Sequence, residues 1–232
     1  MKKVVYSSVA ALLFVSPLAS ANWGINVGPI YVAPSESSSN LDVIESVAGL
    51  PTGSTELAVN DNMQLGLTID YKFTPNWALQ VIAATPFSHD IRVSGSAIDG
   101  LSVGKTKHLP PTLVAQYHFT QFSSKWQPFV GVGLNYTTFF DSQVDPELVG
   151  ALTSLDVITA ANDVDLSLSD SWGLALQAGI NVQLTPQLGV HAMVSRIDIG
   201  TTGRVKVDGA TIQQVDVDID PVVAMVGLRW QF

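Results

Sequence analysis

One stretch of the chain alternates apolar and polar side chains without a break over eleven residues, from Met63 to Phe73. A period of two places the apolar side chains on one face of a β-strand and the polar ones on the other. At about 3.3 Å per residue the strand is about 36 Å long, enough to cross a bilayer at the tilt of a barrel strand. Strands of soluble β-sandwiches average about 5–6 residues, so this segment favours a membrane barrel over a sandwich.

Seven further segments show the same alternation with varying regularity. They are Trp23–Val32, Trp77–Val93, Leu109–Phe119, Pro128–Phe140, Trp172–Leu184, Leu188–Ile199 and Val222–Phe232. An even number of strands suits a closed antiparallel barrel of the outer membrane. We therefore predict an all-β fold: an eight-stranded antiparallel transmembrane β-barrel with up-and-down topology, formed by a single domain at residues 22–232.

The connections between these segments alternate between short and long, as in outer-membrane barrels. The long ones lie at about residues 33–60, 94–108, 141–168 and 200–214, and we expect them to be external loops. Both chain ends then lie in the periplasm. Leucines at helical spacing predict a short helix over the barrel mouth within residues 146–161, and residues 40–47 give a weaker helical signal.

The first 21 residues have the pattern of an export signal. Two lysines precede about twelve apolar residues, and Ala19-Ser20-Ala21 supplies the small side chains of a cleavage site. A spanning helix needs about 20 apolar residues, so this run is too short for a membrane anchor. We expect residues 1–21 to be a cleaved signal peptide and the mature chain to reach the bacterial outer membrane.

The composition excludes several classes of function. Charged residues make up only 13% of the chain, against about 25% in typical domains, which indicates that much of the surface does not face water. The net charge of −9 argues against a nucleic-acid partner. The absence of cysteine excludes disulfides, thiol catalysis and Cys-bound zinc. With no GxSxG motif and no convergent Ser/His/acid set, we expect no catalytic residues, no cofactor and no metal site.

Eight short stretches, taken in order, resemble the OmpW family of small outer-membrane proteins. They are Gln64–Thr68, Ala83–His89, Leu109–Leu113, Gln116–Phe119, Pro128–Phe140, Asp170–Gly173, Asp198-Ile199 and Asp220-Pro221. The terminal Trp230 and Phe232 resemble the C-terminal pattern that the barrel-assembly machinery reads. The resemblance implies a narrow channel for passive uptake of small hydrophobic molecules. It leaves open a channel for small amino acids, a phage or bacteriocin receptor, or a non-conducting stress-response barrel.

The faces opposite the apolar ones predict the contents of the lumen. Residues expected to line or narrow the channel are Gln80, Ile82, Ala84, His118 and Ser195. We expect a polar lower part, with a plug of hydrogen bonds that includes Asp70, and a more apolar upper part. Equally, these side chains could simply fill a barrel of eight strands, whose interior is just wide enough for them. Because the family often has an aromatic residue where this chain has Ser195, we predict a less tightly closed barrel.

Three prolines lie near the external ends of adjacent predicted strands: Pro86, Pro110 and Pro111. Proline has no N–H to give to a β-ladder and is rare in central strands. Pro86 continues the series of residues expected to point inward on its strand. Two interpretations remain open: a side opening into the outer leaflet for an apolar solute, or a local bulge above the hydrocarbon. We expect the partners to be membrane lipid, lipopolysaccharide and a small hydrophobic solute, and the barrel to be a monomer, with an oligomer left open.

Overall fold

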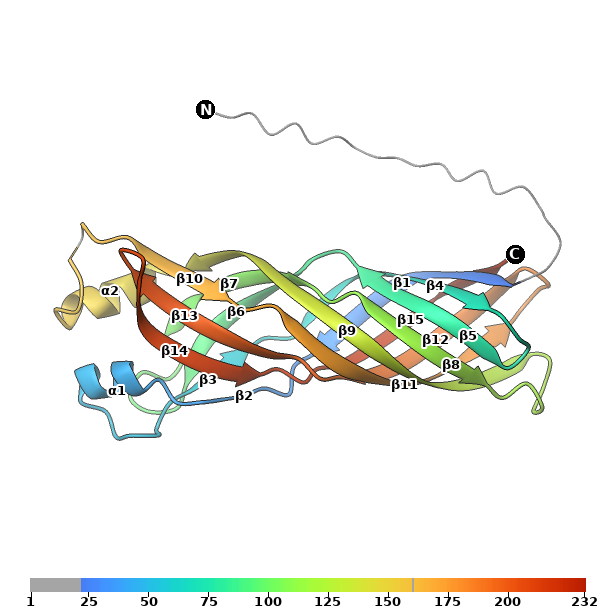
Figure 1. Cartoon of the computed structure of the whole chain (residues 1–232), viewed down its shortest axis with the longest axis horizontal. Coiled ribbons are helices and arrows are strands. Elements are labelled where there is room, and N and C mark those ends of the chain that lie inside the picture. The colour runs from blue at the N-terminus through green and yellow to red at the C-terminus, as the bar shows by residue number, and fades with distance from the viewer. Residues whose placement is uncertain (1–21, 160) are drawn as a thin grey trace, which may run out of the picture.

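The computed structural model describes residues 22–159 and 161–232, so the expected signal peptide at residues 1–21 lies outside the described residues. Eight antiparallel strands close into a barrel in up-and-down order, which confirms the predicted fold class (Figure 1). They are β1 (Trp23–Ala33), β4 (Asn62–Lys72), β5 (Trp77–Ala84), β8 (Thr112–His118), β9 (Trp126–Val144), β11 (Ser171–Gln183), β12 (Leu188–Ile197) and β15 (Val222–Gln231). No helix within the described ranges is long and apolar enough to span a membrane.

The start of β1 and the C-terminus lie at the same end of the barrel, which we call the lower end (Figure 1). The short turns β4–β5, β8–β9 and β11–β12 are at this end. Aromatic pairs mark both rims of the barrel wall: Trp23–Tyr71 and Trp77–Tyr117 below, and Tyr136–Trp172 above. Such girdles are typical of the two membrane interfaces.

The wall of the barrel is apolar outside and polar inside. On β4, the side chain of Leu65 is 56% exposed, whereas the carboxylate-bearing Asp70 is 1% exposed. This is the reverse of a soluble protein, in which large apolar side chains are buried and charges are exposed. The strict alternation of the sequence therefore correctly predicts that one face of each barrel strand is apolar and the other polar.

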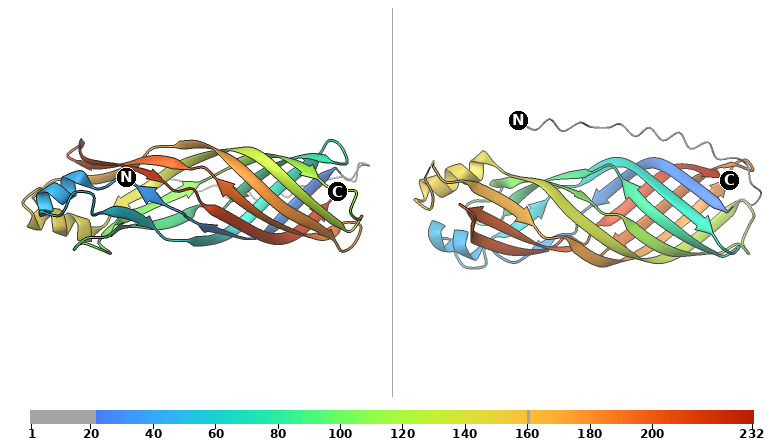
Figure 2. Two further views of the ribbon diagram at one scale, coloured as in Figure 1. Left: turned by 90° about the horizontal axis from the view of Figure 1, so that it is seen from below. Right: turned by 45° about the horizontal axis from the view of Figure 1, so that its top comes forward.

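Above the upper rim, the four long connections contain further β-strands that extend the wall (Figure 2). One side of this extension consists of β3 (Glu56–Val59), β6 (Phe87–Ser94) and β7 (Ser102–Leu109), with β7 paired to β9. The other side consists of β2 (Ser37–Ser38), β10 (Val164–Leu168), β13 (Gly200–Val207) and β14 (Ala210–Asp218). The prediction of plain loops was therefore wrong. These segments alternate as well, but their exposed side chains are polar, as in a water-facing connection.

Two short helices lie at the end of the extension farthest from the C-terminus (Figure 1). They are α1 (Asp42–Ala48) and α2 (Pro146–Ser154). The side chain of Asp145 caps α2 by accepting a hydrogen bond from the backbone of the first turn, and Leu148 and Leu152 face inward and are buried. The predicted helix within residues 146–161 is thus present, although it ends sooner.

Candidate functional site

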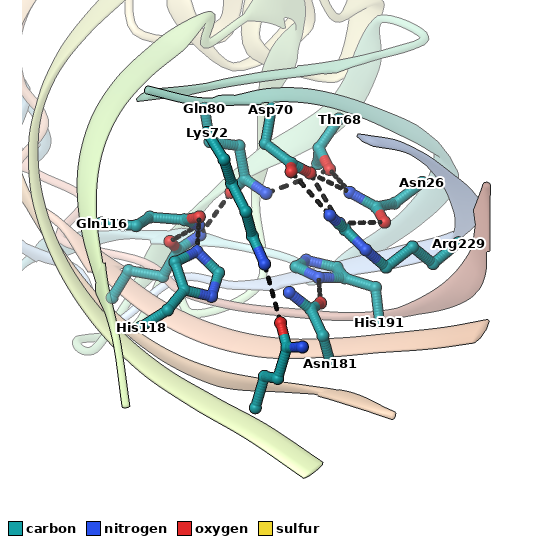
Figure 3. A network of polar contacts seen from close by, with 12 residues as sticks. Asn26, Thr68, Asp70, Lys72, Gln80, Gln116, His118, Asn181, His191 and Arg229 are labelled. Atoms are coloured by element: carbon teal, nitrogen blue, oxygen red, sulfur yellow. Dashed lines mark hydrogen bonds and ion pairs between the residues drawn. The ribbon is translucent and has the colours of Figure 1, made fainter. Parts of the chain in front are cut away.

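Polar side chains from all eight barrel strands gather in the lower half of the lumen, and we call this cluster the polar plug (Figure 3). Its members are Asn26, Thr68, Asp70, Lys72, Gln80, Gln116, His118, Gln127, Gln177, Asn181, His191 and Arg229. The expectation of a polar lower lumen is confirmed by this arrangement. Gln80 and His118, predicted to line a channel, both belong to the plug.

A buried ion pair lies at the centre of the plug. The guanidinium of Arg229 donates two parallel hydrogen bonds to the carboxylate of Asp70, each 2.7 Å long, and a third of 3.0 Å to the side-chain oxygen of Asn26. A two-pronged contact of this kind satisfies both charges where water is excluded. Sequence reasoning missed Arg229, although it is the only charged residue in β15 and alternates with the outward Leu228 and Trp230.

A chain of side-chain amides crosses the lumen above the ion pair. Gln116 donates to Gln177 at 2.7 Å, Gln177 donates to Gln80 at 3.0 Å, and all three are buried. Below them the ring of Phe129 stacks on His191, with ring centroids 5.5 Å apart. These side chains form a hydrogen-bonded and stacked layer across the lower lumen.

An apolar chamber lies inside the extension, between its two sides, with a cavity volume of about 60 Å³. Its lining includes Val32, Leu57, Ile91, Val103, Val205 and Val215. A few polar side chains also reach it, among them those of His89 and His108. The more apolar upper part that the sequence predicts is therefore present, and most of it lies in segments that were expected to be loops.

A smaller cavity of about 20 Å³ lies below the chamber, within the barrel. It brings together three of the predicted channel residues, Ile82, Ala84 and Ser195, and also Pro110. The hydroxyl of Ser195 is buried and donates a 2.9 Å hydrogen bond to the backbone carbonyl of Leu176. Whether the missing aromatic residue at Ser195 loosens the barrel stays a prediction.

The β-ladder is interrupted beside this cavity, and we call the interruption the seam. Pairing between β5 and β8 ends at Ile82 and Thr112, and pairing between β6 and β7 resumes at Phe87 and His108. Residues 83–86 and 109–111 therefore face one another without ladder pairs. Each side remains bonded to its other neighbour, β4 or β9.

All three predicted prolines lie in the seam, but Pro86 does not point inward as predicted. Pro86 is exposed, and the break in the strand shifts the alternation by one residue. The buried side chains after the break are consequently those of Phe87, His89 and Ile91. A proline inside a predicted strand was the sequence signal for this break.

Two histidines that were not assigned a role lie side by side where the chamber meets the seam. The ring centroids of His89 and His108 are 5.0 Å apart, and the ring of Phe139 stacks on His108 at 5.7 Å. Burial lowers the pKa of His108 to about 3, with a smaller contribution from His89. His108 is therefore a neutral imidazole at ordinary pH. His89 contacts the backbone carbonyl of Asn60, and burial lowers its pKa as well.

The two residues of the predicted assembly signal lie on the outer surface at the lower end. Trp230 is exposed on β15, and the backbone N–H of Phe232 donates to the carbonyl of Trp23 at 2.9 Å. The last residue is thus bonded to the start of the first strand, beside the line along which β1 and β15 close the barrel.

Comparisons with known proteins agree with this architecture. A model of the OmpW family matches residues 21–232. The chain is 40% identical over 229 residues to outer membrane protein W of Vibrio cholerae, covering 97% of this chain and 96% of that protein. It is 36% identical over 232 residues to outer membrane protein W of Escherichia coli, covering 100% of both. The crystal structure of outer membrane protein OprG from Pseudomonas aeruginosa matches with a TM-score of 0.75 and 33% identity, over 92% of this chain and 96% of that one.

Proposed function

The chain belongs to the OmpW family and is a β-barrel of the bacterial outer membrane, and from this premise we propose that it takes up small hydrophobic molecules passively. In the proposed path a solute enters the apolar chamber, reaches the smaller cavity, and leaves sideways through the seam into the outer leaflet. The seam, closed off below by the polar plug, is the observation that carries the proposal.

The chamber supports the first part of this path. Lipopolysaccharide presents a charged, hydrated layer to an apolar solute outside the cell, and the extension carries an apolar interior through that layer. Removing apolar surface from water stabilises a bound solute by about 25 cal/mol per Å². The chamber's cavity of about 60 Å³ is smaller than a typical small-molecule pocket, so a solute has to displace some of the alkyl side chains that line it.

The plug supports a sideways exit over an axial one. An apolar solute moving down the barrel axis would have to separate Gln80, Gln116 and Gln177 and pass the Asp70–Arg229 pair. Each separated buried group loses partners that the solute cannot replace, at a cost of about 1–3 kcal/mol, and more for the charged groups. The smaller cavity lies above these groups and next to the seam, where no ladder bond needs to break.

The prolines make an unpaired seam tolerable at the edge of the hydrocarbon. A bare N–H in lipid costs several kcal/mol, and proline has none. The carbonyl of Pro110 accepts hydrogen bonds from Thr112 Oγ1 at 3.0 Å and from Asn135 Nδ2 at 3.2 Å. Side chains within the wall thus replace part of the missing ladder.

The test measures uptake of naphthalene by cells that produce the protein and by cells that do not. We expect wild-type protein to accelerate uptake, and a variant with Pro86→Val, Pro110→Val and Pro111→Thr to lose most of the acceleration, because restored N–H groups can pair across the seam. The matched control replaces Pro75 and Pro186, which lie in lower turns, with alanine and should keep wild-type uptake.

Three results would contradict the proposal. Unchanged uptake by the triple variant would favour a local bulge without transport. Equal rates with and without the wild-type protein would favour a receptor or structural barrel. Glycine is the polar solute in the same assay, and selective uptake of glycine would favour the amino-acid channel.

A further inference from the structure

His108 differs from every other buried histidine of the described chain in its hydrogen bonding. Neither of its ring nitrogens has a hydrogen-bond partner among the described residues, although the side chain is only 4% exposed. In the polar plug, His118 bonds Gln116 through one nitrogen, and His191 bonds Asn181 in the same way. Buried polar atoms are nearly always paired in folded proteins, so two bare nitrogens on one ring require an explanation.

The residues around His108 pack against its ring but form no hydrogen bond with its nitrogens. Phe87 and Phe139 pack against it, with ring centroids at 5.3 Å and 5.7 Å, and His89 meets it edge-on at 5.0 Å. The imidazole also lines the apolar chamber, and its residue forms the first ladder pair above the seam. A solute that moves from the chamber to the seam would therefore pass this ring.

The protonation state of His108 limits what it can bind. A pKa of about 3, caused mainly by burial, keeps the imidazole neutral, so one ring nitrogen donates and the other accepts a hydrogen bond. An alkane or an unsubstituted arene offers neither partner. A carboxylate would bring a charge into an apolar space, which costs far more than a neutral group. A hydroxyl group can donate and accept, and it carries no charge.

We propose that His108 recognises the single hydroxyl group of an otherwise apolar solute, an alcohol or a phenol, at the junction of the chamber and the seam. The inference rests on the proposed uptake function and adds its preferred substrate class. The solute hydroxyl pairs with an imidazole nitrogen while the apolar remainder contacts Phe87, Phe139 and the chamber wall. His89 contributes to the position of the ring by packing against its edge.

The first test measures binding with 1-naphthol and naphthalene, which share a ring system and differ by one hydroxyl. The mature chain is placed in lipid nanodiscs with ¹⁵N-labelled histidine. After correction for partition into lipid, we expect 1-naphthol to bind about fivefold more tightly, the value of one neutral hydrogen bond. We also expect the ring-nitrogen signals of His108 to shift with 1-naphthol and to stay unchanged with naphthalene.

Two variants of His108 separate recognition from packing. His108→Phe should remove the fivefold preference and leave naphthalene binding unchanged within about twofold. His108→Gln keeps a donor and an acceptor and should retain most of the preference. Heat-modifiable migration on gels checks that each variant folds. A preference that survives His108→Phe, or His108 signals that do not move at saturating 1-naphthol, would overturn the inference.

Uptake by cells distinguishes failure of this inference from failure of the proposed function. If wild-type protein accelerates uptake of both compounds equally and shows no binding preference, the hydroxyl site is wrong and the transport proposal stands. If the preference is present in nanodiscs while neither compound enters faster, the site is supported and transport is not. A preference in both assays that His108→Phe removes supports the two together.

Discussion

The barrel and its extension have opposite arrangements of apolar and polar side chains on one continuous wall. Strand β9 belongs to both regions and shows the reversal within a few residues. In the barrel its inward Asn135 is polar and its outward Leu134 is apolar, whereas in the extension its inward Phe139 lines the apolar chamber and Asp141 is exposed. The outer medium is lipid around the barrel and water around the extension, and it dictates the polarity of the outward side chains. The inward side chains have the opposite polarity in both regions.

This reversal separates a hydrogen-bonded part of the interior from an apolar part along the barrel axis. The polar interior is crossed by an ion pair and by amides that are bonded to one another. The apolar interior encloses empty space and leaves His108 unpaired. A network whose members satisfy one another resists rearrangement, because each broken bond leaves a costly bare group. A chamber lined by alkyl side chains has no such bonds to break, which is why the proposed function places the solute there.

The largest effect should come from removing one partner of the plug's ion pair. Arg229→Met leaves Asp70 as an unpaired buried charge, and we expect the free energy of unfolding to fall by about 3–5 kcal/mol. Urea unfolding of the refolded barrel in lipid measures the loss. The double variant Asp70→Leu with Arg229→Met should recover much of it, since no charge is then left unpaired. A small loss in the single variant would show that the lower lumen is wet.

Exchanging valine and threonine in opposite directions tests the reversed polarity directly. Val103→Thr places a hydroxyl in the apolar chamber, and Thr68→Val removes from the plug an acceptor used by Asn26 and Gln80. The two residues have nearly the same shape, so each change should cost about 1–3 kcal/mol through polarity alone. The same urea assay measures both, and a neutral result in either region would contradict its assigned character.

Acid should weaken the native state through His108. Its folded pKa of about 3 lies below the ordinary 6.5, so the unfolded chain binds a proton that the folded chain does not between these values. Stability attributable to this group is therefore intact above pH 6.5 and falls as the pH drops, by at most about 1.4 kcal/mol per pH unit. His108→Phe should unfold with a flatter pH dependence, and the two curves should run parallel above pH 7. Identical slopes below pH 6 would show that the ring is solvated.

The smallest effect is expected at the upper surface, where Arg196 and Asp220 form an exposed ion pair at 3.5 Å. Exposed pairs contribute about 0–1 kcal/mol, so Arg196→Met should lie at or below the error of the urea assay. This variant is also the matched control for Arg229→Met, because both remove an arginine from an ion pair. A loss of unfolding free energy comparable to that of Arg229→Met would mean that burial does not determine how much each ion pair contributes to stability.

The barrel was predictable from the sequence because lipid imposes a strict rule on its outer face. The alternation from Met63 to Phe73 is complete, and the structure has a strand there, at Asn62–Lys72. Most of the extension was not predictable in the same way, since water tolerates any polar residue and the exposed side chains of β7 and β13 resemble those of loops. Nearly all of β6 lies within the predicted strand Trp77–Val93. The assignment of His108 to a loop, and with it the failure to assign the residue a role, follows from this difference.

Parts of the site could not be predicted from the alternation, because they depend on which strands lie side by side and on where a strand is broken. The polar character of Gln80 and His118 predicted a plug, but the sequence does not reveal that Arg229 crosses the lumen to Asp70, because strands distant in the chain are paired by barrel closure. The prolines marked the seam, and its position came from which strands lie side by side. The prediction that Pro86 points inward was wrong because a break in the strand shifts the inward/outward alternation. Periodicity alone does not show where such a break occurs.

The reversal along β9 also fixes how deeply the molecule sits in the membrane. Sinking the barrel would draw charged side chains such as Lys107 and Asp141 into hydrocarbon, where a lysine costs up to about 2–4 kcal/mol toward the midplane. Raising it would expose Leu134 and its neighbours on the wall to water. Both displacements are opposed, so hydrophobic matching holds the wall within a narrow range of immersion. The seam lies directly below Lys107 and His108 of β7, so its depth is set by the same balance.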